Sequence, residues 1–213
     1  MPYAMIHLGV AKNLIDKLKI KELSDFYLGA ISPDAVHLRK NYHESKNISH
    51  LRDSWQNYNL ILDNAKAFIL DNSSHECRDF YIGYGVHVMT DVFWQKYLGS
   101  IEFDLLYYRD PKPIHSDKHD AYYNESDMLD IKLFKEYEHK ATIWNYFIEA
   151  RPIGIDGLVS AEEVSSLHNG VLERFEKRKN EDVNPTRYIL YDEIINFINE
   201  TAVAIYDYLY HAN

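Results

Sequence analysis

Apolar residues recur every three or four positions along most of this chain, which is the spacing that places them on one face of an α-helix. Residues 6–20, for example, carry Ile6, Val10 and Leu14 at this spacing. The strict alternation of apolar and polar residues that is typical of a half-buried strand is missing from the sequence. The pattern therefore predicts an all-α fold in which several helices pack as a bundle around one core.

Capping residues and prolines divide this pattern into separate helices. Ser160 with Glu163 forms the sequence of a capping box, Ser49 is a predicted N-cap, and Pro185 is placed to begin the last helix. We predict helices over residues 6–20, 22–31, 49–71, 75–98, 101–109, 122–149, 161–179 and 185–210. The predicted loops are residues 37–48 and the segment 110–121, which contains two prolines.

Length, composition and charge narrow the possible functions. A chain of 213 residues with 46% apolar residues can bury a sizeable core, and we expect residues 1–213 to form a single domain. The formal net charge of -10 argues against binding to long nucleic acid, which needs basic patches. A small phosphorylated substrate stays compatible with this charge, because a metal ion can supply positive charge locally.

The sequence also bears on location and redox environment. Cys77 is the only cysteine, so an internal disulfide is ruled out. No run approaches the roughly 18 apolar residues that a transmembrane segment needs, and residues 1–7 do not resemble a signal peptide. We therefore expect a cytoplasmic protein without a transmembrane segment.

His87 and Asp91 are the most informative residues, because they lie four positions apart in an apolar, helix-like run. Residues at this spacing share a helix face, so both side chains can point at one spot. Buried polar groups are costly unless something satisfies them, and a shared metal ion would do so. Gly83 lies one turn earlier on the same face, where a missing side chain is expected to leave room for an ion or a substrate.

Three further segments offer partners for this pair. His7 lies near the start of the first predicted helix, Asp34 follows Pro33, and His50 follows Ser49. Three histidines and two aspartates suit zinc or another divalent first-row metal, with one or two ions bound. Each element alone also has an ordinary interpretation. A histidine near a helix end is often a surface residue, Pro-Asp is often a turn, and a helical His-x3-Asp pair is often only hydrogen-bonded.

The set as a whole resembles the zinc-dependent phospholipase C superfamily, which includes the single-strand-specific zinc nucleases. The matching residues run from position 7 to position 94: His7 with Ala11, Gly29-x3-Pro33-Asp34, Ser49-His50, and Gly83-x3-His87-x3-Asp91 with Trp94. The resemblance implies an all-helical bundle of the phospholipase C/nuclease type that binds up to three zinc ions.

Carried over by position, the resemblance implies that Asp34, His50, His87 and Asp91 hold one metal ion, and that His7 holds a neighbouring ion with Asp91 bridging the two. The family also supplies a histidine shortly after the His-x3-Asp pair, followed by a His-x3-Glu pair. Here Gln95 and Tyr97 stand where that histidine is expected, and no later His-x3-Glu occurs. The third metal site is therefore expected to be absent or rebuilt.

These observations together predict a metal-dependent hydrolase, phospholipase C-like, acting on a small phosphoester or phospholipid-like substrate. Asp34 is the predicted catalytic residue, which ligates metal and orients or deprotonates the attacking water. The prolines and histidines of residues 110–121 suggest that this segment borders the site. Two alternatives stay open: an HD-type metal phosphohydrolase built on His119-Asp120, and a non-catalytic helical protein with a residual metal site.

Overall fold

The computed structural model describes residues 3–53, 57–113 and 115–211, and within these ranges the protein consists of helices and loops without a strand. The helices are α1 (Ala4–Leu18), α2 (Leu23–Gly29), the 3-10 helix η1 (Ser32–Leu38), α3 (Tyr42–Ser49), α4 (Tyr58–Asp71), α5 (Arg78–Ser100), α6 (Phe103–Arg109), α7 (Lys118–Glu136), α8 (Lys140–Ile148), α9 (Ala161–Arg178) and α10 (Tyr191–Tyr210). The predicted all-α class is confirmed.

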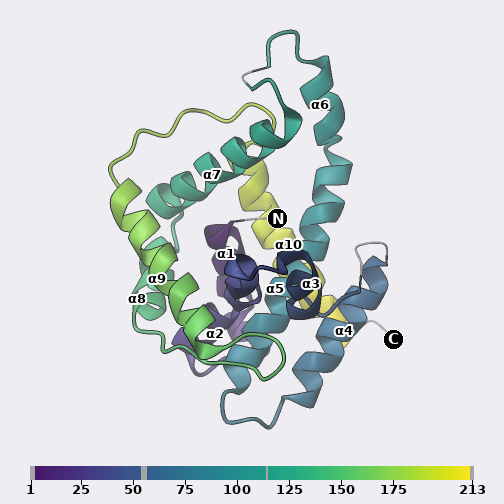
Figure 1. Cartoon of the computed structure of the whole chain (residues 1–213), viewed down its shortest axis with the longest axis vertical. Coiled ribbons are helices and arrows are strands. Elements are labelled where there is room, and N and C mark those ends of the chain that lie inside the picture. Colours follow the sequence, from purple (N-terminus) through teal and green to yellow (C-terminus); the bar gives the residue numbers. More distant parts are fainter. Residues whose placement is uncertain (1–2, 54–56, 114, 212–213) are drawn as a thin grey trace.

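Helix α5 crosses the molecule beside α1, α2, α4 and α10 (Figure 1), and nearly all of its residues from Asp79 to Trp94 are buried. It packs against α2, α4 and α10, while α1 packs against α10 and α7. Helices α7, α8 and α9 lie together on the side of α1 and α2 that is away from α4 (Figure 1). Buried apolar side chains from Met5 to Ile205 form one cluster, so distant parts of the chain share a core.

Two glycines bring the backbones of α2 and α5 into direct contact. A Cβ atom added to Gly83 would lie 2.2 Å from the carbonyl oxygen of Phe26, and one added to Gly29 would lie 2.1 Å from that of Phe80. The interpretation of Gly83 as a space for an ion or substrate is therefore wrong. The backbone of α2 occupies that space, because two helices can approach this closely only where side chains are missing.

The segment before His50 is helical, contrary to the prediction of a loop over residues 37–48. It contains the end of η1 and then α3, whose last residue is Ser49. Ser49 is thus not the N-cap of a helix over residues 49–71. Leu51 has a positive φ of 54°, which breaks the helical path, and α4 starts at Tyr58 behind Asn57, whose side chain accepts a hydrogen bond from the Leu60 backbone. Residues 54–56 of the predicted helix lie outside the described residues.

Two other predicted helices have different bounds because of tertiary contacts. The helix predicted over residues 122–149 is two helices, α7 and α8, separated by Tyr137, which is extended and buried. The last helix starts at Tyr191, not at Pro185. The backbone N–H groups of residues 187–189 donate instead to the carboxylate of Glu125, which holds them outside the helix. The capping box of Ser160 and Glu163 is confirmed.

Asp130 of α7 fixes the start of α1, the helix that carries His7. Its buried carboxylate accepts a hydrogen bond of 2.7 Å from the backbone N–H of Met5, and it also pairs with Arg174 of α9. The first N–H groups of a helix have no partner inside the helix, so this carboxylate acts as a cap supplied from elsewhere in the fold.

The contact between α2 and α5 predicts a large difference between two glycines of the same helix. We expect Gly83→Ala to lower the free energy of unfolding by about 1–3 kcal/mol or more, because the added methyl group has no space and the obstacle is backbone. Gly99→Ala is the matched control, because nothing lies within 4 Å of its added Cβ. It should be neutral or stabilise by up to about 1 kcal/mol. Urea unfolding measures both, and equal effects would contradict the proposed contact.

Candidate metal centre

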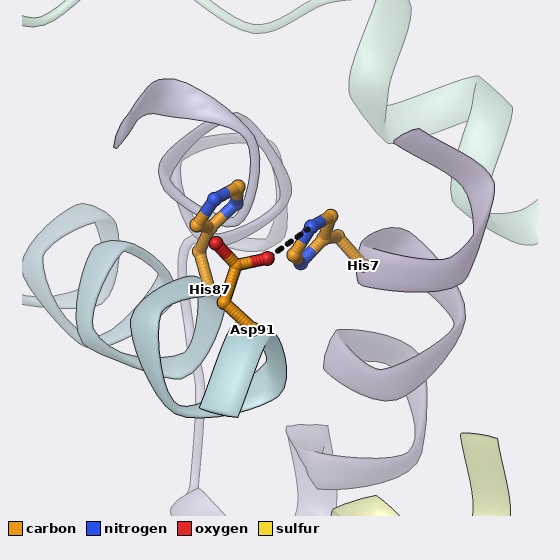
Figure 2. Close-up of side chains that lie close together, drawn as sticks. All are labelled: His7, His87 and Asp91. Carbon is orange, nitrogen blue, oxygen red and sulfur yellow. Dashed lines mark ion pairs between the residues drawn. The ribbon is translucent and has the colours of Figure 1, made fainter. Parts of the chain in front are cut away.

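Five side chains from four helical segments meet next to α5. His7 comes from the first turn of α1, Asp34 from η1, His50 from the residue that ends α3, and His87 and Asp91 from α5. Figure 2 shows His87 and Asp91 projecting from α5 toward His7. The three histidines and Asp91 are buried, whereas the side chain of Asp34 is 26% exposed. The structure thus brings together every residue that the sequence motifs single out.

The spacing of the polar atoms is that of ligands around an ion. The Nε2 atom of His50 lies 3.4 Å from an oxygen of Asp34 and 3.4 Å from Oδ2 of Asp91, and Nε2 of His7 lies 3.6 Å from Oδ1 of Asp91. N–H···O hydrogen bonds are usually near 2.9 Å. Two tetrahedral ligands of a zinc ion, each about 2.0–2.1 Å from the metal, lie about 3.4 Å apart. The observed distances match the second geometry better.

Hydrogen bonds hold two of the imidazoles with a free nitrogen facing inward. His87 donates from Nδ1 to the carbonyl oxygen of Ala30 at 2.8 Å, so its Nε2 carries the lone pair when the ring is neutral. Ser49 donates its hydroxyl hydrogen to the carbonyl oxygen of Lys46 and accepts from Nδ1 of His50 at 2.9 Å. Nε2 of His50 is therefore also an acceptor. Such partners on the outer nitrogen are typical of metal-binding histidines.

The inward-facing atoms have no hydrogen-bond partner among the described residues. These atoms are Nε2 of His7, His50 and His87 and both carboxylate oxygens of Asp91, and Nδ1 of His7 is likewise buried without a partner. Leaving so many buried polar groups unsatisfied is costly, and each group costs about 1–3 kcal/mol or more. A divalent ion satisfies both nitrogen lone pairs and carboxylate oxygens at once, so the donor set fits a metal centre.

Burial and neighbouring charges set the protonation of the site. Burial lowers the pKa of His7 well below its usual value, and His87 lowers it further. Burial also lowers the pKa of His50, although Asp34 acts in the opposite direction. Burial would raise the pKa of Asp34, but His50, His87 and Lys46 hold it well below its usual range. His7 and His50 are therefore neutral and Asp34 is ionised near neutral pH, as metal ligands must be.

An open cavity of about 620 Å³ leads to the site. His7, Asp34 and His87 form part of its wall. The other lining residues belong mainly to α3, α7 and α9, with several aromatic and aliphatic side chains: Tyr3, Ala4, Ile31, His37, Tyr42, Lys46, Tyr123, Ser166, Leu167, Gly170, Val171 and Arg174. A small ligand with an apolar part can therefore reach the ligand atoms of the candidate centre.

Lys46 and Tyr42 are functional candidates that the sequence analysis missed. Both lie on α3, four residues apart, and His50 follows four residues later. This spacing places all three on one helix face, which would have identified them if residues 37–48 had been predicted as helix. Arg52 is buried just beyond His50, and burial lowers the pKa of its guanidinium to about 10, although Asp91 and Asp34 raise it.

The segment 110–121 does not border the candidate site as expected. None of its described residues lines the cavity, and Tyr123 of α7 does so instead. Lys118 and His119 face a different cavity, which lies beside α6. His119 and Asp120 are exposed, and Asp117 next to them caps α7 through hydrogen bonds to their backbone N–H groups. This placement does not support a metal centre of the HD type built on His119-Asp120.

Comparison with known protein families gives a match over residues 6–94, which contain all five candidate ligands. This region matches the family of zinc dependent phospholipase C. The match confirms the resemblance indicated by the sequence motifs. Searches of curated proteins and of solved structures gave no match. Among the described helices, none combines the length and the apolar character that crossing a membrane requires.

The histidine expected shortly after Asp91 is missing, and Gln95 and Tyr97 stand just beyond the matched region. Gln95 faces the cavity beside α6, and Tyr97 donates a hydrogen bond to Glu193 of α10, so neither side chain turns toward the candidate ligands. Trp94 is buried and donates from Nε1 to the hydroxyl of Tyr122. Within the described residues, the His and Asp groups close enough to share an ion are those of this site and the exposed group at Asp117.

The lowered pKa values predict that the metal-free protein loses stability in weak acid. Below about pH 6.5 the histidines of the unfolded chain take up protons, while folded His7 and His50 resist protonation. The unfolded state then binds more protons, so the free energy of unfolding falls as the pH decreases from about 6.5. The ionised Asp34 adds a further loss at lower pH, when its carboxylate becomes protonated.

Urea unfolding in the presence of chelator, measured between pH 7.5 and 5.5, tests this expectation. His50→Gln should flatten the pH dependence, because the substituted residue does not titrate. His43→Gln is the control at an exposed position on the same helix and should leave the slope unchanged. A wild-type stability that stays constant over this range would show that these histidines are not buried in neutral form.

Proposed function

We propose that this protein is a zinc-dependent phosphoester hydrolase of the phospholipase C type, acting on a small phosphoester or phospholipid-like substrate. One observation carries the proposal: buried polar atoms of His7, His50, His87 and Asp91 lack hydrogen-bond partners within the described part of the chain, and His7 and His87 also line an open cavity. The family match over the same residues supports zinc as the ion. Imidazole and carboxylate ligands also suit other divalent first-row metals.

In this proposal Asp34, His50, His87 and Asp91 would hold one ion, and His7 would hold a neighbouring ion together with Asp91. The two oxygens of Asp91 support the bridging role, because Oδ1 is near His7 and Oδ2 is near His50. The Nε2 of His87 lies 3.9 Å from Oδ2 of Asp34, which supports its assignment to the first ion. One or two bound ions fit these ligands.

Bound zinc lowers the pKa of a coordinated water to near 7 and polarises a phosphoryl oxygen. In the hydrolysis, the water oxygen bonds to phosphorus, the ester P–O bond breaks, and the departing oxygen takes up a proton. We assign to Asp34 the orientation of the water and the acceptance of its proton. Asp34 is the carboxylate of the set that reaches the cavity, and its lowered pKa keeps it ionised. Nζ of Lys46 donates to its Oδ1 atom at 3.3 Å.

The walls of the cavity favour a small substrate with an apolar part. Tyr3, Tyr42 and Tyr123 offer ring surface, while Leu167 and Val171 of α9 add aliphatic surface. The net charge of -10 disfavours a long polyanion. A phosphodiester that carries one charge and an aromatic or lipid-like group is therefore the substrate class that we propose.

Asp91→Asn tests the metal centre, because asparagine keeps the shape of the side chain but removes its charge. We expect the variant to lose bound zinc, and zinc should no longer raise its melting temperature, because an ion that binds the folded state stabilises it. Asp71→Asn, at an exposed position on α4, is the control and should keep both properties. Elemental analysis and thermal melting with and without chelator are the measurements. A wild-type protein without metal, and indifferent to chelator, would refute the centre.

Assays of the zinc-loaded protein with bis-p-nitrophenyl phosphate and p-nitrophenyl phosphorylcholine test the hydrolase. We expect chelator to abolish turnover, and Asp34→Asn to lower kcat by about 10²-fold or more, because general-base catalysis contributes at least this much. Asp71→Asn again serves as control. Full zinc occupancy without turnover of either compound would favour the alternative of a non-catalytic helical protein with a residual metal site.

A further inference from the structure

Lys46 places a cationic group at the wall of the cavity, directly beside the candidate metal ligands. The residue is 8% exposed, and its Nζ lies 3.3 Å from an oxygen of Asp34 and 3.1 Å from the hydroxyl of Tyr42. Burying an ammonium group is costly, so such a residue is retained where its charge has a partner. Without an ion, that partner is Asp34.

A bound ion changes this balance. Asp34 would then share its negative charge with the metal, and its attraction for the ammonium group would weaken. The contact to Asp34 is already long for a charge-assisted hydrogen bond, for which about 2.7–2.9 Å is usual. Lys46 has a flexible four-carbon stem and can turn its three donors toward another oxygen in the cavity.

Arg174, the other lysine or arginine side chain that lines this cavity, is already engaged. It pairs with Asp130 and, at 2.8 Å, with Asp127, and its guanidinium lies against the ring of Tyr3. Two carboxylates neutralise it from the side of α7. Arg174 therefore forms part of the wall, whereas Lys46 has one carboxylate partner, and that partner is itself a candidate metal ligand.

We propose that Lys46 binds the phosphoryl group of the substrate, and so supplies positive charge that a further metal ion would otherwise provide. This inference rests on the proposed function. If a single ion is bound, the two carboxylates of Asp34 and Asp91 cancel its charge. The ammonium of Lys46 then becomes the group at the cavity wall that attracts an anionic phosphoryl oxygen, with Tyr42 holding the amino group in place.

Titration of inorganic phosphate into the zinc-loaded protein, followed by calorimetry, tests this role. We expect Lys46→Met to weaken phosphate binding about tenfold or more, which is the usual effect of removing a hydrogen bond to a charged group. Lys46→Arg should recover most of the affinity. Zinc content should stay as in the wild type, because Lys46 is not a ligand. Lys40→Met removes the same charge at an exposed position and is the matched control.

Three outcomes would overturn the proposal. Wild-type affinity for phosphate in Lys46→Met would show that the ammonium does not contact the anion. A loss of zinc in that variant would show that Lys46 instead holds the carboxylate of Asp34 in position as a metal ligand. The third outcome is that the wild type holds zinc and hydrolyses phosphodiesters, while Lys46→Met has the same phosphate affinity and the same KM. That result would refute this inference and leave the proposed function intact.

The failure of the proposed function has a different signature, namely wild-type protein that takes up no zinc. In that case, phosphate binding by the metal-free protein tests whether Lys46 contacts the anion. If the metal-free wild type binds phosphate and Lys46→Met does not, Lys46 forms an anion site without zinc. If the metal-free wild type binds no phosphate, the proposed role of Lys46 is refuted. Thermal melting confirms that each variant is folded, and Lys46→Gln carries the same comparison if Lys46→Met does not fold.

Discussion

The direct contact between the backbones of α2 and α5 is the constraint on which the candidate site depends. Gly29 and Gly83 allow this approach, because neither has a Cβ atom to separate the helices. The contact brings the carbonyl oxygen of Ala30, just after α2, within 2.8 Å of Nδ1 of His87. That bond orients the imidazole, and the same approach places η1 with Asp34 opposite α5. Helix packing and ligand geometry thus have one cause.

The site combines a well-packed surrounding with unsatisfied polar atoms at its centre. His7 and His87 stack with their ring centroids 3.8 Å apart, and their apolar neighbours in sequence, Leu8 and Val88, are buried in the core. A protein interior that was selected only for stability would hold apolar side chains here, since an unpaired buried group is costly. Conflicts of this kind between local stability and residue choice are expected at functional sites.

Electrostatic balance around the site involves more than the ligands. Lys46 lines the cavity and Arg52 is buried, and the charges of Asp34 and Asp91 favour the cationic form of both. On the far wall, Asp127 and Asp130 of α7 hold Arg174. Cationic side chains therefore lie close to the carboxylates of this region, although the chain as a whole is strongly acidic. A negatively charged substrate can approach such a site without facing an unbalanced acidic surface.

The sequence by itself determined the helical class and the identity of the candidate ligands. The helical repeat of apolar residues predicted the class, and the interval between His87 and Asp91 placed them on one face of α5. His7, Asp34 and His50 were singled out by their order along the chain and by the resemblance to zinc-dependent phospholipase C. Helix ends that depend on adjacent residues, such as the capping box at Ser160, were likewise predictable.

Only the tertiary structure decided what depends on partners distant in the chain. Glu125, more than 60 positions away in the sequence, holds residues 187–189 outside the last helix. The backbone of α2 fills the space beside Gly83, which the sequence had suggested was open to an ion or a substrate. The placement of Lys46 is a further example. A lysine in a polar segment predicts solvent exposure, and its burial beside Asp34 results from the packing of α3 against η1. No local pattern encodes that contact, because its two residues belong to different helices whose arrangement the whole core determines.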